Sequence, residues 1–147
     1  ANLDAAARES LLAMLDALRH DRGLAMVLIS HDLGVVRRLA THVVVMYLGR
    51  IVEQGLARDV LDAPQMPYTQ LLRASVPTGR RRVAVAASEE RDAPNIPPPN
   101  GCSFYPRCTH PLKDEGCLSE HPVLRPVTLD PNGHAVACLK VPLPPRL

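Results

Sequence analysis

The chain has 147 residues, of which 46% are hydrophobic, so it can bury the core of one modest domain. Its formal net charge of +2 is too small to indicate a nucleic-acid partner or an anionic membrane surface. No stretch approaches the roughly 18 to 20 apolar residues of a transmembrane helix, and no signal peptide opens the sequence. The sequence does not begin with Met, and we interpret it as a piece of a longer protein.

The first quarter of the sequence predicts a helix, a strand and a second helix. Asp4 is a good N-cap for a helix whose leucines recur at helical spacing, and Gly23 suits the position just after its end. The almost wholly apolar run Leu24–Ile29 predicts a buried strand. A short helix is expected over about residues 33–40.

The next segment predicts a hairpin. Residues 42–48 are apolar after His42 and rich in β-branched side chains, which favours a buried strand. Gly49-Arg50 is expected to form a tight turn, after which residues 51–55 alternate like a hairpin partner. Helix, strand, helix, strand in this order predicts an α/β layer with a parallel pair of strands.

Two short helices are expected next, over about residues 57–62 and 67–74. Pro67 suits a first helical position, where its missing N–H costs nothing. Most of the 15 prolines lie after Val76, and we predict a linker or extended arm over residues 76–99.

His31 follows the predicted strand Leu24–Ile29 at its carboxyl end. Ligands of open α/β sheets collect at that end, so the position is compatible with a ligand-facing role. Position alone is weak evidence, because a His after a strand is more often a capping or solvated residue.

Three motifs occur in order around His31: ANLD before the first helix, LISHDL at the histidine, and VVVMYLGRIVEQG after it. Residues 1–55 thereby resemble the C-terminal part of an ABC transporter ATP-binding subunit. The motifs are similar to that family's D-loop, switch-histidine loop and following hairpin. The resemblance implies an α/β fold, namely the C-terminal part of a P-loop NTPase domain.

The resemblance also implies roles for individual residues. His31 would contact the γ-phosphate of ATP, bound with Mg²⁺, and help to position the attacking water; an imidazole can donate a hydrogen bond to a phosphate oxygen. Leu3 and Asp4 would lie in the D-loop at the interface between two ATP-binding subunits. Asp4 can serve there and still cap the helix. Ala1 and Asn2 depart from the residues usual in this loop.

A Walker A loop, the signature motif and the Walker B carboxylates are absent from this sequence. A Walker A loop binds phosphate through backbone N–H groups and a Lys. The chain alone is therefore expected neither to bind ATP tightly nor to hydrolyse it, and the ATPase activity is expected of a parent subunit.

The second half resembles the C-terminal extension of oligopeptide/dipeptide/nickel ABC importers. The matching blocks are ARDVLDAPQMPYTQLLRASVP, NGCSFYPRCTHPLKDEGCLSEHPVLRPV and GHAVACL, with Met66 where the subgroup usually has His. We therefore expect residues 1–63 to belong to the ATPase domain and residues 64–147 to the extension. The extension would contain a linker over about 77–99 and a four-cysteine region over 101–139.

The four cysteines are spaced C-x5-C, C-x8-C and C-x20-C, which by itself is a weak metal signal. Without a secretory signal, a disulfide framework is less expected than a metal site or plain thiols. In the resembling subfamily, members with these cysteines hold a [4Fe–4S] cluster, and we expect a metal centre here to be structural. The resemblance thus implies four ligands: Cys102, Cys108, Cys117 and Cys138.

Other states of these cysteines remain open. Zinc could be held by the four cysteines, or by three of them with His110, His121 or His134. A disulfide pair or unliganded thiols would fit the same residues.

The resemblance implies several partners and a location. The partners are a second ATP-binding subunit, two transmembrane permease subunits and, indirectly, a substrate-binding protein, with no nucleic acid. The parent subunit would be peripheral, on the cytoplasmic face of the membrane. The alternative is a non-catalytic metal-binding or docking module in which His31 only ends a strand.

Overall fold

The computed structural model describes residues 4–76, 96–130, 133–142 and 144. The chain divides into two compact units, Ala1–Ala40 and Thr41–Leu147, and each is described by itself. Leu3 and residues 77–95 of the predicted linker lie outside the described part. No helix in the described ranges is long and apolar enough to span a bilayer.

The first unit is built from two capped helices, α1 (Ala5–Arg22) and α2 (Leu33–Leu39). Asp4 caps α1, since its carboxylate accepts a 2.7 Å hydrogen bond from the Ala7 N–H. Gly23 ends α1 in the left-handed conformation, with φ of 61°. Both helices and both ends of α1 confirm the sequence-based expectations.

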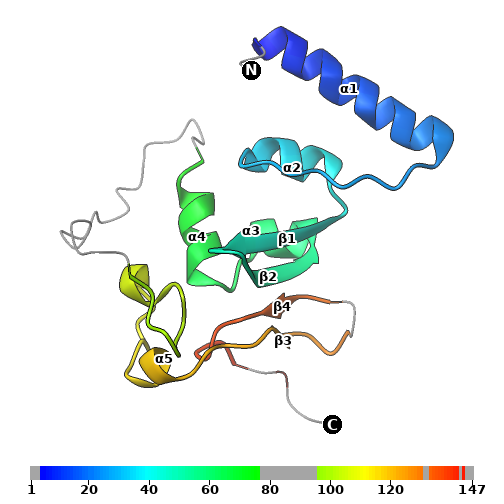
Figure 1. Ribbon diagram of the computed structural model, residues 1–147. Coiled ribbons are helices and arrows are strands. Elements are labelled where there is room, and N and C mark those ends of the chain that lie inside the picture. Colours follow the sequence, from blue (N-terminus) through cyan, green and yellow to red (C-terminus); the bar gives the residue numbers. More distant parts are fainter. Residues whose placement is uncertain (1–3, 77–95, 131–132, 143, 145–147) are drawn as a thin grey trace. The chain divides into compact units, whose positions relative to one another are not determined.

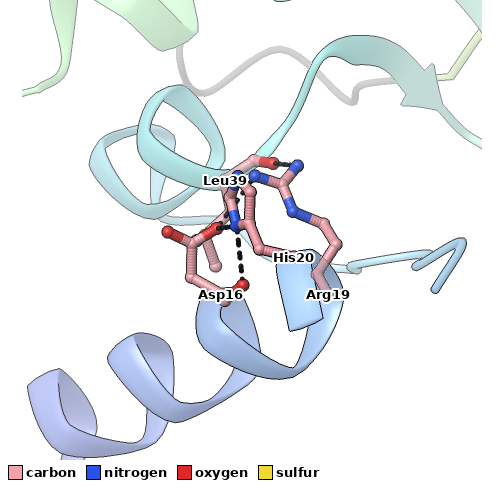
Figure 2. Close-up of polar contacts among 4 residues, drawn as sticks. All are labelled: Asp16, Arg19, His20 and Leu39. Atoms are coloured by element: carbon pink, nitrogen blue, oxygen red, sulfur yellow. Dashed lines mark hydrogen bonds and ion pairs between the residues drawn. The ribbon is translucent and has the colours of Figure 1, made fainter. Parts of the chain in front are cut away.

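Polar contacts near the end of α1 tie it to α2 (Figure 2). The Arg19 guanidinium donates to the Leu39 carbonyl at 3.0 Å and to the Asp16 carboxylate at 2.8 Å. The His20 ring, one turn beyond Asp16, donates through Nδ1 to the Asp16 carbonyl at 2.8 Å. Because Leu39 is the last residue of α2, Arg19 fixes the end of that helix against α1.

The strand predicted at Leu24–Ile29 does not form in the described part of the chain. Val27 is 91% exposed and Ile29 is 95% exposed, which is the opposite of a buried strand. A strand needs neighbours for its N–H and C=O groups and cover for its apolar side chains. The expectation was wrong here because no described strand pairs with this segment.

The second unit is organised around a four-stranded sheet in the order β1-β2-β4-β3 (Figure 1). The strands are β1 (His42–Tyr47), β2 (Arg50–Leu56), β3 (Arg125–Pro126) and β4 (Ala135–Val136). All neighbours pair antiparallel. The predicted hairpin is confirmed, whereas the predicted parallel pair is wrong for the described residues, because the apolar run that would supply its other strand stays unpaired.

The turn of the hairpin lies one residue earlier than expected, at Leu48 and Gly49. Both have positive φ, 46° and 76°, which gives the sharp reversal that suits a twisted hairpin. β1 is also buried on only one face: Val43, Val45 and Tyr47 point into the core, and the alternate side chains are exposed.

The short helices fall where the sequence predicts them. α3 spans Ala57–Asp62 and α4 spans Pro67–Ala74, with Pro67 in the first turn. α3 packs on β1 and β2. The tail adds a 3₁₀ turn, η2 (Tyr105–Arg107), and a one-turn helix, α5 (Gly116–Ser119).

Aromatic rings form the centre of the second unit, although the chain has few of them. Phe104 is only 2% exposed, and its ring lies 5.2 Å from that of Tyr47 and 5.4 Å from that of Tyr68 (centroid distances). The rings of Tyr47 and Tyr68 are 4.7 Å apart. The cysteine-rich tail therefore buries its one Phe in a core shared with β1 and α4, which strengthens the tail beyond its own apolar content.

The tail is also continuous with the sheet. β4 pairs with β2 through Glu53↔Val136 and Gln54↔Ala135. The predicted domain division between residues 63 and 64 stays a prediction, but the sheet joins residues from both sides of it.

Candidate functional site

The predicted site residues fall into two groups, one in each unit. In the first unit, Asp4 is exposed and uses one carboxylate oxygen to cap α1. His31 is also exposed, in the bend before α2. No hydrogen bond or ion pair engages the His31 ring within the described residues, so its two nitrogens remain available to a ligand.

Hydrogen bonds of the residues on either side of His31 stabilise the bend before α2. The Asp32 N–H donates to Ser30 Oγ at 3.0 Å, and the Asp32 carboxylate caps α2 by accepting from Gly34 N–H at 2.9 Å. The second carboxylate oxygen of Asp32 lies 3.7 Å from Arg8 on α1. The backbone at His31 is thus positioned by its neighbours, while its exposed side chain has no partner among the described residues.

In the second unit, all four cysteines line one cavity. They come from distinct local elements: Cys102 precedes the 3₁₀ turn η2, Cys108 ends that turn, Cys117 lies on α5, and Cys138 follows β4. Residues separated by up to 36 positions in the sequence are therefore brought together by the fold. All four thiols are free.

Hydrogen bonds hold each cysteine segment in place, and one of them joins two of these segments directly. The Cys102 N–H donates to the Cys117 carbonyl at 2.9 Å, and the Cys108 N–H donates to the Tyr105 carbonyl at 3.1 Å. Arg125 Nη2 donates to the Cys138 carbonyl at 2.8 Å. The segments carrying all four cysteines are therefore held by bonds that do not use their thiols.

Gly101 allows the segment of Cys102 to lie close to the backbone of the segment of Cys117. A Cβ at Gly101 would lie 2.4 Å from the Leu118 carbonyl oxygen and 2.6 Å from that of Cys117. These are backbone atoms of the α5 segment, which cannot move aside as a flexible side chain would. Gly101 is thus required for the segment of Cys102 to pack on the segment of Cys117.

The electrostatics of the cavity reflect partial burial and close spacing of the thiols. Burial raises the pKa of the Cys102 thiol, and the neighbouring thiols of Cys108, Cys138 and Cys117 raise it further. Burial likewise raises the pKa of Cys108, while the Lys113 ammonium opposes this rise. As free thiols, these two groups therefore favour the protonated form more than exposed thiols do.

Two lysines that the sequence did not single out also line the cavity, Lys113 and Lys140. Lys140 Nζ lies 2.6 Å from Asp114 Oδ2, and this hydrogen bond raises the pKa of Lys140 and lowers that of Asp114. Lys113 Nζ lies 4.2 Å from the centre of the Tyr105 ring. The Cys spacing could not have marked these lysines, because only the fold brings them to the thiols.

The donor set of this cavity suits a metal centre that takes four thiolates, such as a [4Fe–4S] cluster or a Cys₄ zinc ion. Within the described residues, no three His, Cys, Asp or Glu side chains already converge on one point as metal ligands. The fold therefore gathers the four cysteines around one cavity, and metal binding would require the thiols to turn toward a common centre.

The three histidines considered as zinc ligands differ in position. His110 lines the cavity. His134 is bound to Glu53, with Nε2 at 2.6 Å from Oε1, and His121 is not among the residues that line the cavity. Of the mixed ligand sets, the fold thus favours only the one with His110.

Comparisons with known proteins add independent evidence. Residues 52–117 match the family model for the C-terminal region of oligopeptide/dipeptide transporters. The match begins in β2 and ends at Cys117, so it includes three of the four cysteines.

Relatives extend the similarity over nearly the whole chain. The "Probable peptide ABC transporter ATP-binding protein y4tS" of Sinorhizobium fredii is 44% identical over 92% of this chain and 38% of its own length. The dipeptide transport ATP-binding proteins DppF of Haemophilus influenzae and Escherichia coli are 37% and 39% identical, each over 95% of this chain. The alignments cover 42% and 40% of those two proteins. The chain thus spans about two fifths of the length of these relatives.

Proposed function

Because the chain belongs to the oligopeptide/dipeptide transporter family and aligns with the ATP-binding proteins of peptide ABC transporters, we propose that it is the C-terminal part of such a protein. The parent subunit hydrolyses ATP, with Mg²⁺, to power the import of peptides across the cytoplasmic membrane. The observation that carries this proposal is the similarity to these ATP-binding proteins over 92% to 95% of the chain.

In this function His31 acts at the phosphate end of the nucleotide. Its ring donates a hydrogen bond to the γ-phosphate and helps to orient the attacking water. The exposed position of His31 and the absence of an internal partner among the described residues support this role. Phosphoryl transfer depends mostly on positioning and charge stabilisation, so one well-placed donor contributes strongly.

The remaining parts of the ATP site are supplied by other segments and subunits. The phosphate-binding loop belongs to a part of the subunit outside this sequence. Leu3 and Asp4 lie at the interface with a second ATP-binding subunit. Two transmembrane permease subunits and a substrate-binding protein complete the importer, and the ATP-binding subunits sit on the cytoplasmic face of the membrane.

Uptake of labelled peptides tests the transport function directly. Cells that lack the native polypeptide carrying this chain should lose ATP-dependent uptake of a dipeptide or an oligopeptide, and the native gene should restore it. Uptake of labelled nickel chelate serves as the parallel assay, since the sequence leaves the substrate open. If all three uptakes are unchanged, the importer function is wrong, and the alternative of a docking module is favoured.

We also propose that the cavity of the second unit holds a [4Fe–4S] cluster through Cys102, Cys108, Cys117 and Cys138. Their common cavity and the hydrogen bond from the Cys102 N–H to the Cys117 carbonyl support this assignment. The cluster would cross-link η2, α5 and the segment after β4, and so stabilise the tail. We assign it no electron transfer.

Metal analysis after anaerobic purification tests the cluster. The expected result is iron with acid-labile sulfide and a brown protein. A colourless protein with stoichiometric zinc would show that the cavity holds zinc and not an iron–sulfur cluster. A protein with neither metal, also after anaerobic reconstitution, would leave four plain thiols and overturn the proposal.

A further inference from the structure

We propose that Lys113 and Lys140 are charge-compensating residues of the four-cysteine centre, and that Asp114 tunes the contribution of Lys140. This inference rests on the proposed metal centre. It goes beyond that centre by assigning functions to residues that neither the cysteine spacing nor the comparisons mark.

The positions of the charges are the first argument. Lys113 and Lys140 line the same cavity as the four cysteines. No carboxylate belongs to the described lining of this cavity, so its charged side chains are cationic. Arg125 adds a third positive charge nearby, because its guanidinium donates to the Cys138 carbonyl.

The chemistry of the occupant is the second argument. Four thiolates outweigh the positive charge of a [4Fe–4S] core or of a zinc ion, so the ligated centre is net negative in either case. A partly buried net charge without compensation is costly, because the protein around it screens charge less well than bulk water does. Two ammonium groups at the cavity wall supply this compensation.

Asp114 makes the two lysines unequal. Its carboxylate holds Lys140 at 2.6 Å, and its backbone carbonyl accepts from the Cys117 N–H at 3.1 Å. Loss of the Lys140 charge would leave the Asp114 carboxylate unneutralised beside the centre, which adds a repulsion. Among the described residues, no carboxylate pairs with Lys113, whose ammonium lies against the Tyr105 ring.

Glutamine and arginine variants of the native polypeptide separate charge from packing. Lys140→Gln and Lys113→Gln should each speed the release of metal to a chelator, within roughly the 10- to 100-fold range of residues that support a metal site. Lys140→Gln should have the larger effect. Lys140→Arg should restore slow release, and Lys140→Gln combined with Asp114→Asn should restore it in part.

The reduction potential provides a second readout for an iron–sulfur centre. Reduction adds a negative charge, so each Gln variant should shift the midpoint potential to a more negative value, and each Arg variant should not. Arg58→Gln, at an exposed position of α3, is the matched control, because it removes a positive charge that does not line the cavity. Protease resistance of the metal-free variants checks that the fold is retained.

The outcomes separate this inference from the proposal on which it rests. A wild-type protein that takes up neither iron nor zinc would overturn the metal centre itself. A wild-type protein that binds metal, with Gln variants that match it in release rate and potential, would overturn the charge compensation alone. Equal effects of Gln and Arg would also overturn it, since packing and not charge would then be responsible.

Discussion

Nε2 of His134 lies 2.6 Å from Oε1 of Glu53, and the two side chains are 5% and 0% exposed. The same carboxylate oxygen accepts the Gln65 N–H at 2.6 Å. Glu53 belongs to β2 and His134 directly precedes β4, so the contact joins residues 81 positions apart. It fixes the tail to the hairpin beside the short β2–β4 ladder.

Removal of either partner should destabilise the second unit strongly. His134→Leu removes the hydrogen bond between the buried side chains of Glu53 and His134, and the loss of a buried hydrogen-bond partner costs about 1 to 3 kcal/mol. Glu53→Leu combined with His134→Leu should lose less than the sum of the two single changes. Urea unfolding of the four proteins measures this coupling, with the exposed Arg58→Ala as control. Additive losses would contradict the pairing.

Gly101→Ala should loosen the packing of the Cys102 segment on α5. The new methyl group would meet the Leu118 and Cys117 carbonyl oxygens well inside contact distance, so the backbone must shift, at a cost of about 1 to 3 kcal/mol. Gly116→Ala is the matched control, because its methyl group would meet only the Asp114 carboxylate, at 3.2 Å. Thermal unfolding and the alkylation rate of Cys102 and Cys117 measure the difference. Equal behaviour of the two variants would rule out the close approach at Gly101.

His31→Ala in the native polypeptide should leave ATP binding nearly intact and lower hydrolysis roughly 100-fold or more, as expected for the loss of one transition-state donor. Nucleotide affinity and steady-state phosphate release measure the two effects separately. The control is His42→Ala, which removes an exposed imidazole from β1. Unchanged turnover in the His31 variant would show that His31 does not act on the γ-phosphate.

The elements that could be predicted from the sequence are those whose signals are local. Asp4 caps α1, Gly23 ends it, and Pro67 opens α4, because each depends on one or two backbone groups nearby. The hairpin of β1 and β2 was also predictable, since its partners are adjacent in sequence. The conformation of the apolar run Leu24–Ile29 could not be predicted from local signals, because a strand forms only when another strand pairs with it.

The four cysteines of the tail could be named from the sequence, whereas the two lysines that line their cavity could not. Cysteine is a rare residue whose thiol has few common roles, so all four residues stand out in the sequence as candidates. Lys113, Lys140 and the Glu53–His134 pair have no such signal, because a surface Lys or a lone His is common. Their roles depend on the pairing of β2 with β4 and on the packing of the tail around Phe104.

The raised thiol pKa values predict an alkaline loss of stability in the metal-free protein. In the unfolded chain the Cys102 and Cys108 thiols titrate near their ordinary value of 9.0, and in the folded chain burial raises their pKa. The folded state therefore binds more protons in this range, so stability is full below about pH 9 and falls as the pH rises toward the folded pKa.

Urea midpoints measured between about pH 8 and pH 10 test this dependence. The variant with Cys102→Ser and Cys108→Ser should show a flatter profile, because serine hydroxyls do not titrate there. The Lys140–Asp114 pair is present in both proteins, so the raised pKa of Lys140 contributes equally to both and cancels in the comparison. A wild-type profile as flat as that of the double variant would show that these thiols are not shifted by burial in the cavity.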